Sequence, residues 1–388
     1  MGILSPITKK IKNAFINIII RLNLPIDRNK IVISVFQDEF TCNAKYITKK
    51  LIERNLKITI IWVLDKKTKI DNFPERVKIV RKKTLRFYLE VMTSKIWIDN
   101  AINFFYFKPS IPKRKGQFLI NTWHGSLGLK KIGRDDNKNP IWVKNAERCD
   151  TDTDFLISNS VFESEVYKNT YWPSVKILNY GHPRNDILFI SENESNKIKE
   201  IFCKKIKTSS STRFVLWGPT FRDVFSNDIY NINHQSILDS LKLRFGGEWC
   251  FLVRLHHKLR KKLKFSDCNN IIDVTDYPDI QELLVISDVG ITDYSSWICD
   301  FVLTSKPAFI YAPDIEDYNK ERGFYYPLES TPFPVSSTQT QLLRDIENFN
   351  SEIYQKKQEQ FLKARGCWED GKASDRVVDK ILSLIRKD

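Results

Sequence analysis

The chain has 388 residues, of which 42% are hydrophobic and 28% are charged, and its formal net charge is +15 at pH 7. This composition is that of a globular protein and excludes a disordered chain, while the length suits two domains of roughly 150 to 200 residues. The basic charge predicts a polyanionic partner, either nucleic acid, anionic lipid or a phosphorylated substrate. The seven cysteines are scattered without a C-x-x-C pair, so neither a disulfide framework nor a zinc site is indicated, and we expect reduced thiols in the cytoplasm.

Residues 1–25 are expected to form a basic, amphipathic helix. Apolar residues recur at helical spacing at positions 4, 7, 11, 15, 18 and 22, with Lys9, Lys10, Lys12 and Arg21 between them. No apolar run approaches the ~20 residues of a membrane span, and no signal-peptide cleavage site is evident. The helix either lies in the interface of an anionic membrane or packs on its own domain, and the sequence favours neither alternative.

Short β-rich runs then alternate with longer amphipathic stretches. In the first half the pattern predicts helices at 41–54 and 161–169, and strands at 30–36, 57–63, 77–80, 95–98, 118–123, 154–158 and 175–180. In the second half it predicts strands at 213–217, 248–255, 270–274, 284–291 and 308–311, separated by helices at 234–244, 278–287 and 297–303. A last helical region, 352–387, can return toward the first domain.

Two successive β/α halves predict an α/β protein with two doubly wound parallel sheets. We place one Rossmann-like domain at residues 26–190 and a second at 208–375, followed by a helix end at 376–388. The lysine-rich polar stretch 191–212 is expected to join them. Because ligands of such sheets bind at the carboxyl ends of the strands, polar residues just after apolar runs are the candidates for function.

One such polar turn runs from Thr292 to Ser296, between a predicted strand and a predicted helix. Unpaired N–H groups at the start of a helix, together with serine hydroxyls, favour a phosphate. The alternative is that Asp293 or Ser295 merely caps the helix, which is the commoner use of these residues.

Three of the five histidines, His124, His182 and His256, also follow predicted strands. A histidine in this position titrates near neutrality and suits a general base, although a surface or turn position is its alternative role. Arg222 follows the strand 213–217, and its guanidinium fork fits a phosphate; alternatively it pairs with Asp223 or a neighbouring helix. The common signatures of P-loop, dinucleotide-binding, metalloprotease and α/β-hydrolase sites are absent.

Seven segments together resemble those of a known family. They are TWHG at 122–125, GxPRND at 181–186, PTFRD at 219–223, RxH at 254–256, SDVGITDYSS at 287–296, RGFY at 322–325 and DGKAS at 370–374. In these segments the chain resembles the CDP-glycerol glycerophosphotransferases, which prime and polymerise wall teichoic acid and related capsular polymers. The resemblance covers about residues 118–380, and residues 1–117 carry no segment that we can align.

The resemblance implies a GT-B fold, in which two doubly wound Rossmann-like domains face each other across a cleft. The nucleotide donor is then held mainly by the second domain, while the acceptor approaches from the first. His124 is implied as the catalytic base and His256 as a second catalytic residue at the donor diphosphate. The residues implied in substrate binding are Gly125, Ser126, Lys130, Arg184, Asp186, Thr220, Arg222, Arg254, Thr292, Asp293, Ser295 and Ser296.

The chain departs from the family pattern at three places. One extra residue precedes Leu129 and Lys130 after the His-Gly pair. His182 stands where an aromatic residue is usual, and His257 replaces a common proline.

The implied reaction transfers glycerol phosphate, or a similar alditol phosphate, from CDP-glycerol or CDP-ribitol to an acceptor hydroxyl, with release of CMP. The acceptor is a lipid-linked saccharide or a growing polymer. Such chemistry needs alignment and charge neutralisation, so no cofactor is required, and Mg²⁺ is possible. We expect a bacterial enzyme that is peripheral on the inner face of the cell membrane.

Two alternatives stay open. A GT-B glycosyltransferase that uses a nucleotide sugar would release a nucleoside diphosphate instead of CMP. A basic nucleic-acid-binding protein is disfavoured, because the lysines are spread over both halves and no binding module is recognised. We therefore expect no nucleic-acid partner.

Overall fold

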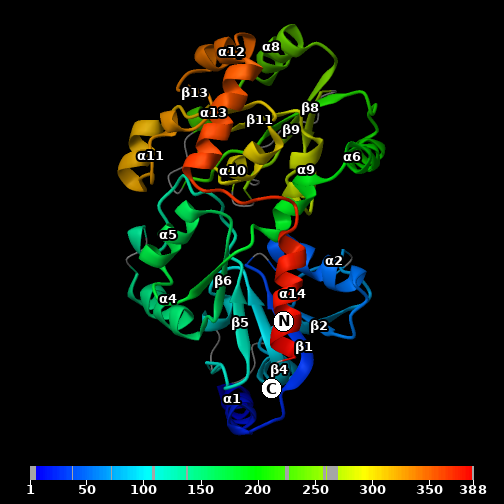
Figure 1. The fold of residues 1–388 in the computed structure, drawn as a ribbon, viewed down its shortest axis with the longest axis vertical. Helices are drawn as coiled ribbons and strands as arrows, with labels where there is room; N and C mark the ends of the chain where they lie inside the picture. Colours follow the sequence, from blue (N-terminus) through cyan, green and yellow to red (C-terminus); the bar gives the residue numbers. More distant parts are fainter. Residues whose placement is uncertain are drawn as a thin grey trace.

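A computed structural model describes residues 6–36, 38–70, 72–106, 110–136, 139–222, 227–256, 259 and 270–386. It shows two α/β domains, one above the other, and the chain passes between them twice (Figure 1). The first passage precedes α6 (Glu192–Ile206), and the second joins α13 (Ser351–Ala364) to α14 (Ala373–Ile385).

The N-terminal domain is built on a seven-stranded sheet with the order β3-β2-β1-β4-β5-β6-β7, in which neighbouring strands pair in parallel. Helices cover both faces, so the strands are nearly continuous apolar runs. The strands are β1 (Asp27–Ser34), β2 (Thr59–Leu64), β3 (Val77–Arg81), β4 (Ser94–Asp99), β5 (Phe118–Asn121), β6 (Phe155–Ser158) and β7 (Lys176–Asn179).

The C-terminal domain repeats this plan with a six-stranded parallel sheet in the order β10-β9-β8-β11-β12-β13. The strand order reverses between β1 and β4 in the first sheet and between β8 and β11 in the second, which confirms two doubly wound sheets. The strands are β8 (Arg213–Trp217), β9 (Trp249–Val253), β10 (Ile271–Asp273), β11 (Val289–Thr292), β12 (Ala308–Tyr311) and β13 (Val335–Ser336).

The helices differ from the prediction in three places. The run 284–291, predicted as one strand, is divided between α9 and β11, because Asp279 caps a helix that extends to Ile286. The polar stretch 191–212 contains α6, which begins with a Ser191–Glu194 capping box and packs Phe202 into the C-terminal core. The region 352–387 breaks into α13 and α14.

The remaining helices lie on the two domains as follows. The N-terminal domain has α1 (Pro6–Arg21), α2 (Cys42–Glu53), α3 (Leu85–Thr93), α4 (Pro140–Asp152) and α5 (Val161–Thr170). The C-terminal domain has α7 (Asn227–Tyr230), α8 (His234–Phe245), α9 (Ile280–Ile286), α10 (Trp297–Phe301), α11 (Ile315–Glu321) and α12 (Gln339–Glu347). Short 3₁₀ turns are η1 (Asn103–Tyr106), η2 (Gly133–Asp135), η3 (Pro183–Phe189), η4 (Val302–Thr304) and η5 (Leu328–Ser330).

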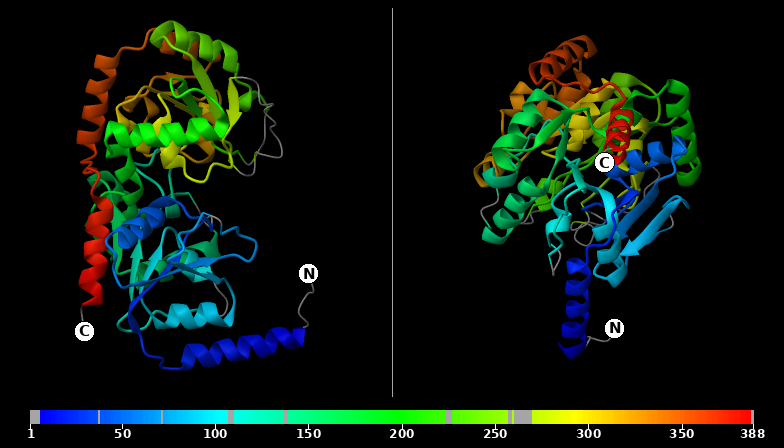
Figure 2. Two further views of the ribbon diagram at one scale, coloured as in Figure 1. Left: turned by 90° about the vertical axis from the view of Figure 1, so that its right-hand side faces the viewer. Right: turned by 60° about the horizontal axis from the view of Figure 1, so that its bottom comes forward.

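Helix α14 returns to the N-terminal domain, as the sequence indicated. Its apolar face, with Val377, Val378, Ile381 and Leu384, is buried in one core cluster with β1, β2 and α2. Figure 2 shows α13 and α14 running down one side of both domains. The last helix in the sequence therefore completes the core of the first domain.

Helix α1 packs on its own domain with one face and leaves apolar side chains of another face exposed. Ile16 is buried against the N-terminal core, and Ile19 and Ile20 pack beside it. Phe15, Ile18 and Leu22 point outward and are 56%, 54% and 47% exposed. Among the described residues, no helix is both long and apolar enough to cross a bilayer.

Candidate active site

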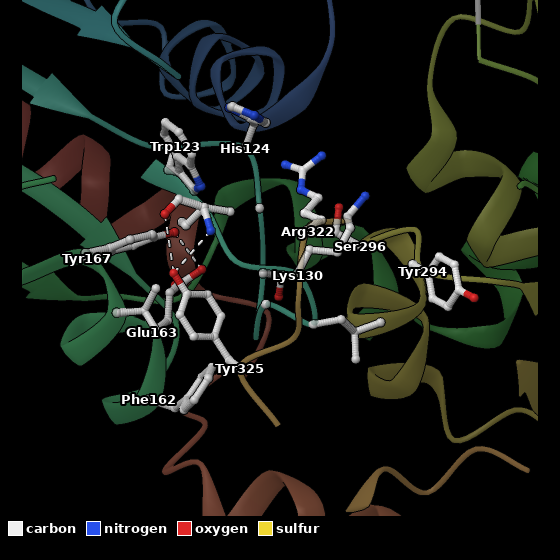
Figure 3. Close-up of a pocket in the computed structure, with 16 residues that line it drawn as sticks. Trp123, His124, Lys130, Phe162, Glu163, Tyr167, Tyr294, Ser296, Arg322 and Tyr325 are labelled. Carbon is white, nitrogen blue, oxygen red and sulfur yellow. Dashed lines mark hydrogen bonds between the residues drawn. The ribbon is translucent and has the colours of Figure 1, made fainter. Parts of the chain in front are cut away.

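His124 follows β5 and lines a cavity of about 250 Å³ between the two domains (Figure 3). Its Nδ1–H donates to the backbone carbonyl of Asn100, which follows β4, at 2.7 Å. Because a carbonyl only accepts, this bond fixes the tautomer and leaves Nε2 unprotonated. The ring stacks on Phe36, which follows β1, with the ring planes 7° apart.

The surrounding protein keeps His124 neutral. The side chain is exposed where it faces the cavity, but the protein packed around its other sides disfavours the charged form and lowers its pKa to about 4, against the opposing effect of the Asn100 carbonyl. A neutral imidazole with a free Nε2 is the form that accepts a proton.

The turn that presents His124 is unusual in its backbone. Trp123 has a φ of 48°, in the left-handed region that bulky residues rarely adopt. Asn43 holds the turn by donating to the carbonyls of Thr122 and Trp123, and the indole ring packs against Trp172. Such strain persists only where the surroundings enforce it, and it is common at functional sites.

Both domains contribute to the cavity wall. Five of the residues implied by the resemblance line it, namely His124, Gly125, Ser126, Lys130 and Ser296. Further lining residues are Trp123, Phe162, Glu163, Tyr167, Tyr294, Arg322 and Tyr325. Figure 3 shows Trp123, Phe162, Tyr167 and Tyr325 gathered at one end and Tyr294 on the opposite side.

In the C-terminal domain the loops after β8 and β11 meet at the switch point. The N–H of Thr220 donates to both carboxylate oxygens of Asp293, at 2.8 and 3.0 Å, and the hydroxyl of Thr292 donates to the carbonyl of Gly218. Ser296 is the N-cap of α10, yet its side chain makes no capping hydrogen bond. The simple capping role for Asp293 or Ser295 is therefore not what the structure shows.

Arg222 is buried in a network of its own domain. It pairs with Asp314 at 2.7 Å and with Asp293 at 2.9 Å, and its guanidinium carbon lies 4.8 and 4.6 Å from the ring centroids of Tyr294 and Tyr318, which stack on each other. Burial disfavours its charge, but the two carboxylates outweigh burial and raise the pKa of Arg222. The ion-pair alternative is thus observed, with Asp293 and Asp314 as partners; Asp223 lies outside the described residues.

Three further implied residues support the site from outside the cavity. Arg184 forms a bidentate pair with Asp300 of α10, at 2.8 and 3.1 Å, and donates to the carbonyl of Gly125 at 2.7 Å. Asp186 accepts from the first two N–H groups of α14, at 2.9 and 2.7 Å. Arg254 donates to the carbonyl of Tyr277 at 2.7 Å. Arg184 therefore connects the two domains, Asp186 orders the start of α14, and Arg254 orders the loop at Tyr277.

The other two strand-end histidines occupy different environments. His256 is half-buried and stacks on Phe221 of the loop after β8, with centroids 5.4 Å apart, and neither residue lines the cavity. His182 is fully buried, and its Nε2 lies 3.0 Å from Glu163, which also accepts from Tyr167 at 2.6 Å. His182 is therefore neither a surface residue nor a cavity residue, and His257 lies outside the described residues.

Sequence reasoning missed several cavity residues. Arg322 and Tyr325 stood in a quoted segment to which no role was given, and the α5 residues Glu163 and Tyr167 carry no distinctive sequence signal. Two backbone hydrogen bonds join the segment that follows His124 to the segment that follows α11. Lys131 N–H donates to the Gly323 carbonyl at 3.1 Å, and Tyr325 N–H donates to the Leu129 carbonyl at 2.9 Å. We call residues 129–132 and 322–325 the interdomain ladder.

Neither metal clusters nor disulfides are found in the described part of the chain. Its six cysteines are free, and no three His, Cys, Asp or Glu side chains lie close enough together to hold a metal ion.

Comparison with known proteins identifies the family of the chain. Residues 16–383 match the family described as CDP-glycerol:poly(glycerophosphate) glycerophosphotransferase. A teichoic acid poly(glycerol phosphate) polymerase of Staphylococcus epidermidis is 29% identical over 364 residues, which are 90% of this chain but only 49% of that protein. The Bacillus spizizenii polymerase is 29% identical over 362 residues, with 89% of each chain covered.

The fold is shared as well. The solved structure of the wall teichoic acid polymerase TagF superposes with a TM-score of 0.83 at 27% identity, covering 99% of this chain and 96% of that one. This likeness confirms the GT-B arrangement of two Rossmann-like domains. The family match begins at residue 16, so it includes most of residues 1–117, where the sequence showed no segment of the family. The chain belongs to the CDP-glycerol:poly(glycerophosphate) glycerophosphotransferase family.

Proposed function

We propose that this enzyme transfers an alditol phosphate from CDP-glycerol, or from CDP-ribitol, to a hydroxyl of a lipid-linked saccharide or a growing polymer. The observation that carries the proposal is the position of His124, which hydrogen-bonds the Asn100 carbonyl through Nδ1 and lines a cavity with Lys130, Ser296 and Arg322. The family supports the donor, and a TagF variant has been solved with CDPG.

The proposed step is an in-line displacement. The acceptor hydroxyl gives its proton to His124 Nε2, and its oxygen attacks the β-phosphate of the donor. The bond from this phosphorus to the bridging oxygen breaks, and CMP leaves with the electron pair. Positioning and charge stabilisation supply most of the rate enhancement of such reactions.

We infer two kinds of role for the C-terminal residues. Ser295 and Ser296 donate hydrogen bonds to the donor diphosphate, and His256 reaches it from the loop after β9. Thr220, Thr292, Asp293 and Arg222 hold the two switch-point loops in place beneath it. A structure with CDP-glycerol should place a phosphate oxygen about 2.7 to 3.2 Å from at least one serine hydroxyl.

Product analysis tests the proposed reaction. The enzyme is incubated with CDP-glycerol or CDP-ribitol and either a lipid-linked saccharide or a glycerol phosphate oligomer, and the released nucleotide is separated. We expect CMP, released only when an acceptor hydroxyl is present. Transfer from a nucleotide sugar, with release of a nucleoside diphosphate, would instead support the glycosyltransferase alternative.

The pH profile of kcat/KM should be a plateau between two ionisations. His124 must be neutral, so activity rises through its pKa of about 4 and is complete at neutral pH. Burial and the nearby Arg322 lower the pKa of Lys130 to about 8, so its charge, and the activity that depends on it, is lost above that pH. Lys130→Arg should shift only the alkaline limb upward. An acid limb between about pH 6 and 7 would contradict the assignment of a neutral, desolvated His124.

We also propose that the enzyme attaches to an anionic membrane through α1. The exposed residues Phe15, Ile18 and Leu22 are joined by Leu85 and Leu89 of α3, which are 41% and 38% exposed and lie on the helix that packs beside α1. An exposed apolar surface on a basic protein fits a membrane interface.

Vesicle binding tests this attachment. The double variant Phe15→Glu and Ile18→Glu should bind phosphatidylglycerol vesicles at least about tenfold more weakly, because each burial is worth about 1.5 to 3 kcal/mol. Turnover of a water-soluble acceptor should not change, since both side chains are exposed. The matched control is Ile201→Glu with Leu243→Glu, at side chains 67% and 77% exposed on the C-terminal domain. Equal vesicle binding by both double variants would exclude α1 as the membrane contact.

A further inference from the structure

Arg322 is the arginine that faces the cavity. It directly follows α11, where its N–H donates to the carbonyl of Tyr318 at 3.0 Å. Its side chain lines the cavity, and Figure 3 shows the guanidinium between His124 and Ser296. Arg222, by contrast, is 5% exposed and is not among the lining residues.

The guanidinium of Arg322 is only partly engaged. Its one ion pair among the described residues joins Nη2 to Asp136 at 3.2 Å, and both side chains are about a third exposed, at 38% and 33%. An ion pair of this exposure is weak and exchangeable. Arg222 differs, because two carboxylates bind it in a buried setting.

A second cation lies nearby. Lys130 lines the same cavity from the N-terminal domain, and no carboxylate of the described residues lies within 4.0 Å of its ammonium group. Burial lowers the pKa of Lys130 most, and the nearby charges of Arg322 and Arg222 lower it further, while Asp293 and Asp136 oppose them. Two cations that line one cavity, with the exposed Asp136 as the only carboxylate among the described residues that pairs with either of them, favour an anionic group.

The interdomain ladder fixes the distance between these cations. Lys130 pairs across it with Phe324, so Lys130 and Arg322 are placed by the same strip of backbone contacts. The hydroxyl of Tyr325 adds a hydrogen bond to Asp135 at 2.8 Å. The pair therefore forms only when the two domains are in the arrangement seen here, which is the arrangement that brings His124 and Ser296 to one cavity.

We propose that Arg322, with Lys130 opposite it, binds the phosphoryl group that is transferred, the one distal to the cytidine. The inference rests on the proposed function and adds to it the group that neutralises the reacting phosphate. As the acceptor oxygen bonds to phosphorus and the bridging oxygen leaves with CMP, the guanidinium fork holds the non-bridging oxygens, and Asp136 is displaced from it. Arg322 is thus a catalytic residue and Asp136 its exchangeable partner.

Calorimetry with two nucleotides tests the assignment, because CMP lacks the distal phosphate that CDP-glycerol carries. Arg322→Gln should weaken CDP-glycerol binding about tenfold or more and leave CMP binding unchanged within about twofold. It should also lower kcat by about 10²- to 10³-fold, the usual loss when one donor to a transition-state oxyanion is removed. Arg322→Lys, which keeps the charge without the fork, should lie between wild type and Arg322→Gln.

Two matched controls separate contact with phosphate from support of the fold. Asp136→Asn breaks the same ion pair but leaves the cation in the cavity, so it should keep wild-type kcat within about threefold. Lys320→Gln makes the same change of charge at the same end of α11, where Lys320 is 74% exposed, and should have no effect.

Each other outcome overturns the inference. If Asp136→Asn reproduces the defect, Arg322 acts by holding the interdomain ladder. If CMP and CDP-glycerol weaken equally, the contact is with the nucleotide, and if only the KM of the acceptor rises, it is with the acceptor. Failure of the wild-type enzyme to bind either CDP-alditol would instead refute the proposed function, before any variant is compared.

Discussion

Replacement of His124 with alanine should lower turnover by about 10²- to 10⁴-fold while the affinity for CDP-glycerol changes by no more than a few fold. The imidazole acts on the acceptor hydroxyl. Its Nδ1–H is already bonded to the Asn100 carbonyl, so the ring has no free N–H group for a hydrogen bond to the diphosphate of CDP-glycerol. Single-turnover release of CMP gives the rate, and calorimetry gives the affinity.

Phe36→Leu is the matched control for this variant, because it removes the ring stacked on His124 but leaves the hydrogen bond to Asn100. We expect a loss of less than about tenfold, since the tautomer is retained. His124→Ala with more than about a tenth of the wild-type rate would remove His124 from the role of base.

Replacement of Arg222 with alanine should destabilise the C-terminal domain by about 3 to 5 kcal/mol, because Asp293 and Asp314 would be left buried without their counter-charge. Donor binding falls as a consequence, since Asp293 also orders Thr220 across the switch point. Denaturant unfolding followed by tryptophan fluorescence measures the loss.

A variant at an exposed ion pair provides the reference for this loss of stability. Lys242 and Glu248 are 57% and 79% exposed, so Lys242→Ala should cost less than about 1 kcal/mol. If Arg222→Ala were as mild and yet abolished CDP-glycerol binding, Arg222 would contact the donor directly and the structural role inferred for it would be wrong.

The strands that the sequence predicted best are those buried on both faces. β8 and β12 were predicted at their observed bounds, because an unbroken apolar run flanked by polar residues has few other interpretations. The same rule failed at 284–291. There the end of a buried helix is followed by a buried strand, and because both are apolar, the spacing of hydrophobic residues cannot separate them.

The sequence alone could not show which of the two arginines, Arg222 or Arg322, faces the cavity. Arg222 and Arg322 both follow regular elements within quoted segments, and both were compatible with binding a phosphate. Their difference depends on Asp314, which lies 92 residues from Arg222 and joins it only after the sheet has formed. The candidate base was easier to predict from the sequence, because His124 directly follows a recognisable strand and needs only the local turn to reach the cleft.

The position of α14 determines the order in which the two domains complete their cores during synthesis. The ribosome delivers residues 373–385 after the entire C-terminal domain, yet Val377, Val378, Ile381 and Leu384 belong to the core of the N-terminal sheet. Before they emerge, the face of that sheet that α14 shares with α2 lacks part of its cover and exposes apolar surface to water. The domain that is translated first is thus the domain that matures last. A fusion partner or a truncation at α14 would damage the pocket of His124, more than two hundred residues earlier in the chain, before it disturbed the C-terminal domain that directly precedes this helix.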